Sequence, residues 1–218
     1  MKYKLAIFDL DGTILDTLED LTDSTNHVLS SNGYPIHSID EIRSYVGNGI
    51  YMLIKRAVPN DTEEKEIQRL FEQFVSYYKD HCAIKTKAYE GIKELLVALK
   101  EKGIKRAVVS NKGDFAVKIL IDDYFAGLFE ISVGEKQGVR KKPYPDSVNE
   151  VLRELSVTKE EAVYIGDSEV DIQTAKNAGL VCISVSYGFR SKEFLKENGA
   201  SLIVEDVKGL YKELLGDE

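Results

Sequence analysis

The spacing of apolar residues changes along this chain, and the changes predict where its elements lie. Leu5 to Phe8 form a short apolar run, which is typical of a strand buried on both faces. From about residue 15 to residue 83, apolar residues instead recur every three or four positions, as on one face of a helix. This block predicts helices over 17–32, from a capping box at 38–41, around 50–57 and over 62–81, without a strand.

From Tyr89 onward, short apolar runs alternate with helical patterns. Strands are predicted at 106–110, 129–133, 162–165, 181–185 and 201–204, with helices at 91–102, 115–122, from Pro145, at 169–178 and twice more near the end. Repeated strand–helix units indicate a parallel sheet. We therefore expect an α/β fold, with a Rossmann-like parallel sheet covered by helices on both faces at 1–14 and 86–218. An all-helical cap domain at 15–85 is inserted after the first strand.

The composition narrows the class of protein. The chain has 218 residues, enough for one large or two small domains, and its hydrophobic content of 43% is ordinary for a globular protein. Its net charge of -8 argues against sequence-independent binding to nucleic acid or to an anionic membrane. Two cysteines give no metal-binding or disulfide pattern, and no stretch is long and apolar enough to span a membrane. We therefore expect a cytoplasmic protein without nucleic-acid or membrane partners.

The first candidate chemistry lies at the end of the first predicted strand. Asp9 and Asp11 follow the apolar run, and Gly12 and Thr13 then interrupt the strand. In an open α/β sheet, ligands gather at the carboxyl ends of the strands. Two carboxylates this close repel one another unless a cation compensates them, and Mg²⁺ prefers such oxygen ligands together with phosphate oxygens. On its own, the motif also fits a plain Asp-Gly turn.

Three further predicted strand ends carry polar groups. Ser110, Asn111 and Lys112 follow one strand, and a hydroxyl beside a backbone N–H suits a phosphate oxygen. Lys141 and Lys142 precede Pro143 in a proline-fixed loop, where an ammonium can neutralise a phosphate. Taken singly, the first segment is an ordinary loop with a helix cap, and the second is an ordinary solvated basic turn.

The third of these strand ends is acidic. Gly166 allows close approach of the backbone, Asp167 lies just past the strand, and Asp171 follows one helical turn later, after Ser168. Asp167 is suited to be a further metal ligand, and Asp171 is suited to be either another ligand or a support behind the ligands. A simple helix cap at Asp167 is the plainer interpretation of this segment alone.

Together, the four segments resemble the four motifs of the haloacid dehalogenase superfamily, over essentially the whole chain. The motifs are D-x-D-G-T at 9–13, Ser110-Asn111, Lys142-Pro143 and G-D-S-x-x-D at 166–171. The resemblance implies that Asp9 is a nucleophile that forms an aspartyl-phosphate, and that Asp11 is the general acid and base. With an aspartate at position 11, the chain resembles the family's phosphatases and phosphomutases. The family's dehalogenases and ion pumps lack an aspartate at this position.

The resemblance also implies the ligand sets. Mg²⁺ would be held by Asp9, the backbone carbonyl of Asp11 and Asp167, with Ser168 and Asp171 behind them. The phosphoryl oxygens would be bound by the following groups: Gly12, Thr13, Ser110, Asn111 and Lys142. Lys142 is preferred over its neighbour because it directly precedes the proline, as in the family.

Cap residues choose the leaving group in this family, which directs attention to Arg43, Gly47, Asn48 and Gly49. The Gly-Asn-Gly turn is similar to the phosphoglycolate phosphatase branch, and its backbone N–H groups beside an arginine suit a small carboxylate. The resemblance therefore implies a Mg²⁺-dependent phosphatase for a small phosphorylated metabolite, with 2-phosphoglycolate as the expected substrate. A β-phosphoglucomutase-like isomerase, or an inorganic pyrophosphatase or nucleotidase, stays open as an alternative. The sequence assigns no role to Lys112 or Arg190.

Overall fold

The computed structural model describes residues 2–216, which form two compact units. One unit runs up to Leu15 and resumes at Ala88, and the other spans Asp16–Lys87. The division lies beside the boundaries at 14–15 and 85–86 that the sequence predicts. None of the described helices is both long and apolar enough to cross a membrane.

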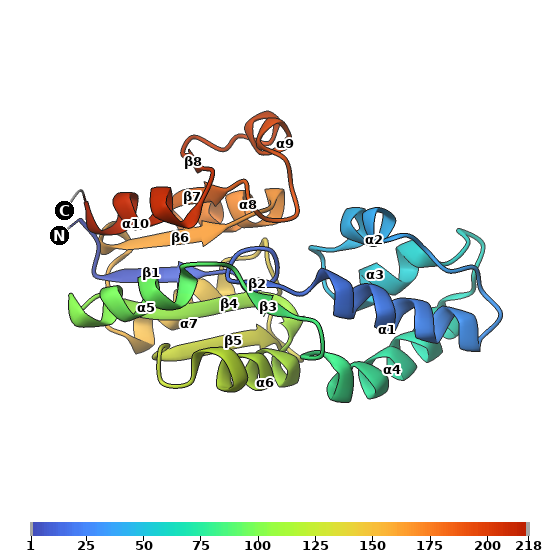
Figure 1. The fold of residues 1–218 in the computed structure, drawn as a ribbon. Helices are drawn as coiled ribbons and strands as arrows, with labels where there is room; N and C mark the ends of the chain where they lie inside the picture. The colour runs from blue at the N-terminus through green and yellow to red at the C-terminus, as the bar shows by residue number, and fades with distance from the viewer. Residues whose placement is uncertain (1, 217–218) are drawn as a thin grey trace. The chain divides into compact units, whose positions relative to one another are not determined.

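The first unit is built on a six-stranded sheet in the order β5-β4-β1-β6-β7-β8 (Figure 1). All neighbouring strands are parallel, and β1 lies between β4 and β6. The strands are β1 (Leu5–Phe8), β4 (Lys105–Gly113), β5 (Ile131–Glu135), β6 (Ala162–Gly166), β7 (Val181–Val185) and β8 (Ile203–Val204). Because the strands are parallel, the segments that follow β1, β4 and β6 all leave the sheet at the same edge.

Helices cover both faces of this sheet, as the sequence predicts. They are α5 (Ile92–Glu101), α6 (Asp114–Phe125), α7 (Asp146–Glu154), α8 (Glu169–Ala178), α9 (Lys192–Glu197) and α10 (Val207–Leu215). Leu5 and Ile7 of β1 pack in one core cluster with Val148 and Val151 of α7 and Ala175 of α8. Figure 1 shows α5 and α10 on the opposite face. A strand covered on both sides buries all its side chains, which explains the uninterrupted apolar run of β1.

The second unit contains four helices: α1 (Leu18–Ser31), α2 (Ile39–Tyr45), α3 (Ile50–Ala57) and α4 (Glu64–His81). The predicted capping box at Ser38 and Glu41 is present and opens α2. The apolar stripe of α4 is buried, with Leu70, Phe74 and Tyr78 inaccessible to solvent. The packing of these stripes, and not helix propensity alone, stabilises the unit.

One buried carboxylate ties the two ends of the second unit together. Asp20 of α1 accepts hydrogen bonds from the backbone N–H groups of Ile84, Lys85 and Thr86, at 2.8–3.1 Å, and from the Thr86 hydroxyl at 2.8 Å. These donors lie in the segment that follows α4. A charged acceptor that collects several backbone donors makes strong hydrogen bonds, so it fixes the returning chain on α1.

Three sequence predictions differ from the structure in detail. A short pair, β2 (Leu15–Asp16) and β3 (Lys87–Ala88), lies where no strand is predicted, so the inserted block is not purely helical. Pro145 is the cap of α7 and not its first helical residue. The strand predicted from Phe129 begins at Ile131, and the Phe129 ring packs edge-on against that of Phe8, with 6.1 Å between the ring centroids. The apolar character of Phe129 reflects this core contact and not strand pairing.

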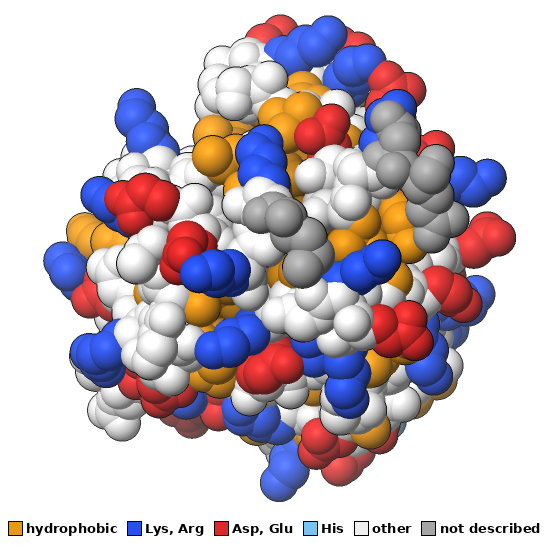
Figure 2. Space-filling view, turned by 90° about the vertical axis from the view of Figure 1, so that its left-hand side faces the viewer, with side chains coloured by type: hydrophobic (Ala, Val, Ile, Leu, Met, Phe, Trp, Pro, Cys, Tyr) orange, Lys and Arg blue, Asp and Glu red, His pale blue; other side chains and the backbone are white. Residues whose placement is uncertain are grey.

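The surface at the chain ends is mixed in character. In Figure 2, which views the left-hand side of Figure 1, lysine and arginine side chains are interspersed with acidic and hydrophobic ones. Such interspersion is ordinary for a solvated face. The concentrated chemistry lies at the other edge of the sheet, where the strands end.

Candidate active site

Asp9 lies just past the end of β1 and is buried, with 8% of its surface exposed. Its backbone N–H donates to the carbonyl of Ile165 on β6 at 2.9 Å, so the sheet ladder continues into the site. Gly12 follows with a φ of +77°, and a Cβ there would lie 2.3 Å from Asp167 Oδ2. Only glycine permits this close approach, which brings the loop after β1 against the loop after β6.

Lys142 supplies the cation that faces Asp9. Its Nζ lies 2.9 Å from Asp9 Oδ1, 2.7 Å from Asp171 Oδ1 and 3.1 Å from the Tyr164 hydroxyl. Burial by itself lowers the pKa of this lysine, but the charges of Asp171 and Asp9 outweigh burial and raise the pKa well above its usual value. Lys142 therefore stays protonated beside the predicted nucleophile. The neighbouring Lys141 instead pairs with Glu135 at 3.5 Å, outside this cluster.

Asn111 holds the backbone of Lys142 in place. Its side-chain amide donates to the Lys142 carbonyl at 3.0 Å. Ser110 is buried next to it, and its Oγ accepts from the backbone N–H of Lys112 at 3.3 Å. Both residues belong to β4, which continues to Gly113, whereas the sequence predicts that this strand ends at Ser110. The structure gives the Asn111 side chain a supporting contact in addition to the phosphate binding that the sequence predicts.

The buried carboxylates repel one another. Burial raises the pKa of Asp9 to about 7, Lys142 opposes this, and Asp171 and Asp11 add to it. Burial, together with the charges of Asp171 and Asp9, also raises the pKa of Asp167 well above its usual range. Two carboxylates that resist ionisation when buried together are stabilised as anions by a bound cation.

The donor set fits a metal ion. Within the described part of the chain, Asp9, Asp167 and Asp171 place one carboxylate oxygen each within 4.8 Å of the others. The oxygens of Asp171 are already bonded, Oδ1 to Lys142 and Tyr164, and Oδ2 to the backbone N–H and hydroxyl of Ser168. Asp9 Oδ1 is buried and pairs with Lys142 Nζ at 2.9 Å. Hard oxygen donors of this kind suit Mg²⁺.

Asp11 faces a different cation. Its Oδ1 accepts a hydrogen bond from Lys112 Nζ at 2.8 Å, and the Lys112 side chain is 1% exposed. The carboxylate of Asp11 is therefore not part of the three-carboxylate cluster. The sequence-based expectation that only its backbone carbonyl meets the metal stays a prediction.

The sequence also matches a known protein family. The sequence profile of haloacid dehalogenase-like hydrolases matches residues 6–185. The chain belongs to the haloacid dehalogenase-like hydrolase family. The match begins inside β1 and ends with β7, so it includes all four strand ends that carry the candidate motifs.

Several similar proteins are named phosphoglycolate phosphatase. A phosphoglycolate phosphatase of Psychrobacter arcticus is 33% identical over 99% of this chain and 97% of its own length. Another, of Pseudomonas savastanoi pv. phaseolicola, is 32% identical over 95% of this chain and 78% of its own length. A crystal structure from Lactobacillus delbrueckii subsp. bulgaricus, provisionally assigned as a phosphoglycolate phosphatase, is 40% identical. It covers all of both chains with a TM-score of 0.95.

The loop after β7 of this hydrolase contributes groups that the sequence analysis missed. Tyr187 donates from its hydroxyl to the carbonyl of Thr13 at 3.0 Å, and the backbone N–H of Phe189 donates to Asp167 Oδ2 at 2.7 Å. A Cβ on Gly188 would lie 2.1 Å from the Gly12 carbonyl oxygen. The glycine between two aromatic residues after a strand was the available signal, but nothing in the sequence indicates which loops it meets.

Two other side chains, those of Thr13 and Arg190, also influence Asp167. The hydroxyl of Thr13, which is fully buried, donates to Asp167 Oδ1 at 3.3 Å. Arg190 pairs with Glu169 at 3.4 Å, and its charge partly offsets the rise in the Asp167 pKa. The sequence predicts Tyr164 only as a strand residue, but in the structure its hydroxyl contacts both Lys142 and Asp171.

The predicted specificity residues lie together in the second unit. Arg43 pairs with Asp40 at 2.8 Å on the surface of α2. The Asn48 side-chain oxygen accepts from Arg56 at 2.6 Å, between two glycines with positive φ. Gly49 is the cap residue of α3, with a φ of +84°, so the turn leads into a helix as the sequence indicates.

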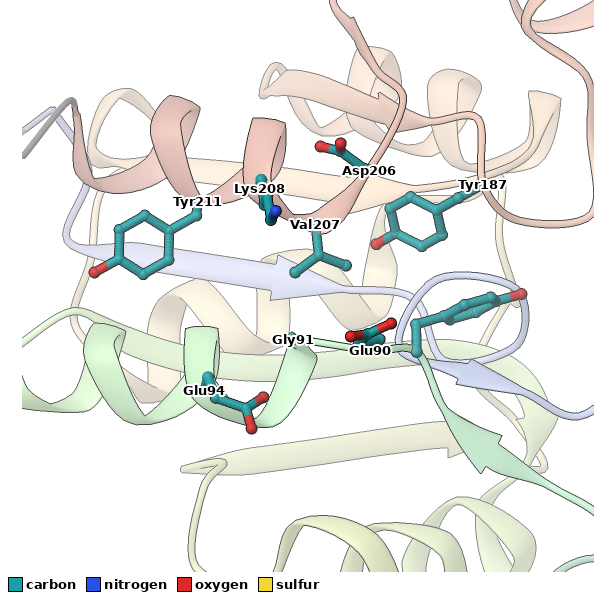
Figure 3. Close-up of a pocket in the computed structure, with 9 residues that line it drawn as sticks. Glu90, Gly91, Glu94, Tyr187, Asp206, Val207, Lys208 and Tyr211 are labelled. Carbon is teal, nitrogen blue, oxygen red and sulfur yellow. The ribbon is translucent and has the colours of Figure 1, made fainter.

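A pocket of about 610 Å³ lies elsewhere in the first unit (Figure 3). It is lined by residues of α5, α10 and two loops, among them Glu94, Val207 and Tyr211. Tyr187 forms one wall, and this is the residue whose hydroxyl bonds the Thr13 carbonyl. The candidate catalytic side chains do not line this pocket, so it is separate from the active site.

Proposed function

We propose that this hydrolase is a Mg²⁺-dependent phosphatase that acts on a small phosphomonoester through an aspartyl-phosphate at Asp9. One observation carries the proposal: Lys142 Nζ lies 2.9 Å from the buried carboxylate of Asp9, and a second buried carboxylate, Asp167, places an oxygen within 4.8 Å of an oxygen of Asp9. A carboxylate nucleophile and the phosphate that it attacks are both anions, so positive charge close to each of them is needed to offset their repulsion. The four motifs and the names of the similar proteins support the same reaction.

In the first step, a carboxylate oxygen of Asp9 attacks phosphorus, and the bond between phosphorus and the ester oxygen breaks. Asp11 donates a proton to the departing alkoxide. The backbone N–H groups of Gly12 and Thr13 already donate to the carbonyls of Leu15 and Leu10, so the side chains of Thr13, Ser110, Asn111 and Lys142 are the proposed donors to the phosphoryl oxygens. Their hydrogen bonds stabilise the charge that develops there.

In the second step, water attacks the phosphorus of the aspartyl-phosphate, and Asp11 takes a proton from that water. The bond between phosphorus and Asp9 breaks, so inorganic phosphate leaves and Asp9 is restored. Mg²⁺, which phosphatases of this family generally use, would be held by Asp9, Asp167 and the Asp11 carbonyl, where it would screen the carboxylates and polarise the phosphoryl group. Asp171 and Ser168 would support these ligands from behind.

The proposed substrate is 2-phosphoglycolate. Arg43 and the turn at Gly47, Asn48 and Gly49 offer an arginine and backbone N–H groups to its carboxylate. The phosphoglycolate phosphatases of Psychrobacter arcticus and Pseudomonas savastanoi, which are about one-third identical, support this assignment.

The test is phosphate release from 2-phosphoglycolate, with Mg²⁺ and with excess chelator, beside pyrophosphate and hexose phosphates. We expect magnesium-dependent release that is fastest with phosphoglycolate, and no turnover by a folded Asp9→Asn variant. Activity retained by Asp9→Asn would exclude the mechanism. Conversion of β-glucose 1-phosphate without net phosphate release would instead identify a mutase, and preferred pyrophosphate or nucleotide turnover would replace the substrate.

The cap assignment has its own test. Arg43→Met should raise the KM for phosphoglycolate at least 10-fold, because a charge-assisted bond to a carboxylate contributes about 1.5–3 kcal/mol. Arg69→Met is the matched control, since Arg69 is also an exposed arginine paired with an acid three residues away. An equal effect of both variants would remove Arg43 from the site.

A further inference from the structure

Lys112 is a buried cation to which neither the motifs nor the proposed reaction gives a role. It lies near the end of β4, next to Ser110 and Asn111, and β4 pairs directly with β1. Its side chain is 1% exposed, and its Nζ lies 2.8 Å from Asp11 Oδ1, whose side chain is 14% exposed. A lysine is rarely buried to this extent unless it is paired with an opposite charge.

We infer that Lys112 is the positioning residue for the general acid and base, Asp11. This inference rests on the proposed function, because it gives Asp11 the proton-transfer role described above. The bond from Lys112 fixes one carboxylate oxygen of Asp11, and so fixes the plane of the carboxyl group and the direction of its other oxygen. Proton transfer to the leaving oxygen requires hydrogen-bond distance and alignment, so this orientation affects the rate.

The structural argument is one of local support. Asp11 lies in a loop that contains Gly12, whose φ of +77° makes the segment a turn and not a continued strand. Lys112, by contrast, belongs to β4, which pairs with β1 up to Val108 and with β5 up to Val109 and again at Gly113, the residue after Lys112. Catalytic groups are held accurately when residues on rigid elements fix their rotamers. The pair therefore ties the loop carboxylate to the central sheet.

The pair also differs in kind from the Lys142 cluster. Lys142 bonds the nucleophile side of the site, through Asp9 and Asp171, whereas Lys112 bonds Asp11. Two buried lysines thus serve two aspartates of one D-x-D motif. Removal of Lys112 should impair the proton transfers and leave the attack by Asp9 intact.

The decisive readout is the dependence of kcat/KM on the leaving group. This ratio reports the steps up to transfer of the phosphoryl group to Asp9, in which Asp11 acts as an acid. A series of substrates from alkyl phosphates, 2-phosphoglycolate among them, to 4-nitrophenyl phosphate covers leaving groups that need a proton and one that does not. A merely structural defect would lower all members of the series equally.

We expect Lys112→Met to lower kcat/KM for alkyl phosphates by about 10- to 100-fold, part of the 100- to 10,000-fold that general acid catalysis supplies. The loss for 4-nitrophenyl phosphate should be several-fold smaller. Lys112→Arg, which keeps the charge, should recover part of the alkyl activity. Lys136→Met is the matched control, because it removes an exposed lysine from a pair with Asp114 at 3.7 Å, and it should leave the whole series unchanged.

The double variant Asp11→Asn/Lys112→Met tests the route of the effect. If Lys112 acts through Asp11, its removal adds little once Asp11 is gone, and the two losses are strongly non-additive. A full additional loss in the Asp11→Asn background would overturn the inference. So would an equal loss for all substrates, or a rise confined to the KM for carboxylate-bearing substrates. Absence of phosphatase activity in the unmodified protein would instead overturn the proposed function.

Discussion

Lys142 Nζ bonds Asp171 Oδ1 at 2.7 Å, and the same nitrogen lies 2.9 Å from Asp9 Oδ1. Asp171 is completely buried, and both its oxygens are used within the protein. The carboxylate of Asp171 therefore orients Lys142 and favours its protonated form, and Lys142 faces the proposed nucleophile, Asp9. The sequence allows Asp171 to be either a metal ligand or a support, and these contacts favour the role of a support.

We expect Asp171→Asn to lower kcat by about 10- to 100-fold, as for other groups that hold a catalytic side chain from behind. The Mg²⁺ concentration at half-maximal activity should change little, because Asp9 and Asp167 are retained. Titration of activity with Mg²⁺ measures both quantities. Asp146→Asn, which leaves a surface arginine without its partner at 3.0 Å, is the control. A large increase in the Mg²⁺ requirement would make Asp171 a metal ligand.

Stability without metal should fall as pH rises from about 4 to about 7. Burial raises the pKa of Asp9 from 3.8 to about 7, so the folded state keeps a proton that the unfolded chain loses in this range. Stability falls wherever the folded state binds more protons than the unfolded state. Thermal unfolding in chelator, compared between the unmodified protein and Asp9→Asn, isolates this contribution. The variant should gain stability relative to the unmodified protein as pH rises, and a constant difference would contradict the shift.

Added Mg²⁺ should stabilise the unmodified protein at pH 7.5, because a ligand that binds only the folded state raises its stability by mass action. The same addition should have a much smaller effect on Asp9→Asn. Melting temperatures at several Mg²⁺ concentrations provide the measurement, with Ca²⁺ as a second divalent ion. Equal stabilisation of both proteins would place the metal elsewhere.

Gly188→Ala should weaken the metal site without a change in net charge. The new Cβ would lie 2.1 Å from the Gly12 carbonyl oxygen and 2.5 Å from the Asp167 Cβ, so both loops must move. We expect at least a 10-fold loss of kcat/KM, since displacement of a group by about 1 Å can cost about 100-fold. Gly209→Ala is the control, because its Cβ meets atoms only at 3.4 Å or beyond. Full activity of Gly188→Ala would show that the loop after β7 is not needed for the site.

Asp20→Ala should destabilise the second unit by about 2–4 kcal/mol, because it leaves several backbone N–H groups without their acceptor. Faster hydrogen exchange at Ile84, Lys85 and Thr86 would locate the effect. Asp23→Ala removes an exposed carboxylate that pairs with Lys85 at 2.7 Å, and it should cost much less stability than Asp20→Ala. Equal costs for the two variants would mean that the Asp20 bonds do not hold this segment.

Local patterns were sufficient for the elements and for the four motifs. The apolar run of β1, the helical spacing of α4 and the capping box at Ser38 depend on neighbours within a few residues, so the sequence displays them directly. Parallel strands all end at one edge of the sheet, and this rule predicts from the sequence alone that Asp9, Lys142 and Asp167 belong to one site. Where the pattern misled, as at Phe129, an apolar residue served the core from outside a strand.

Only the tertiary structure decided which of these groups contact one another. The sequence by itself determined the α/β fold, the inserted helices and the set of candidate acids and lysines. It did not determine that Lys142 bonds Asp171, that Lys112 bonds Asp11, or that Gly188 closes on Gly12 from 176 residues away. Such pairings depend on distances between loops that the strand order brings together, and no local periodicity encodes those distances. Residue type shows which groups can react, whereas their packing decides which of them meet.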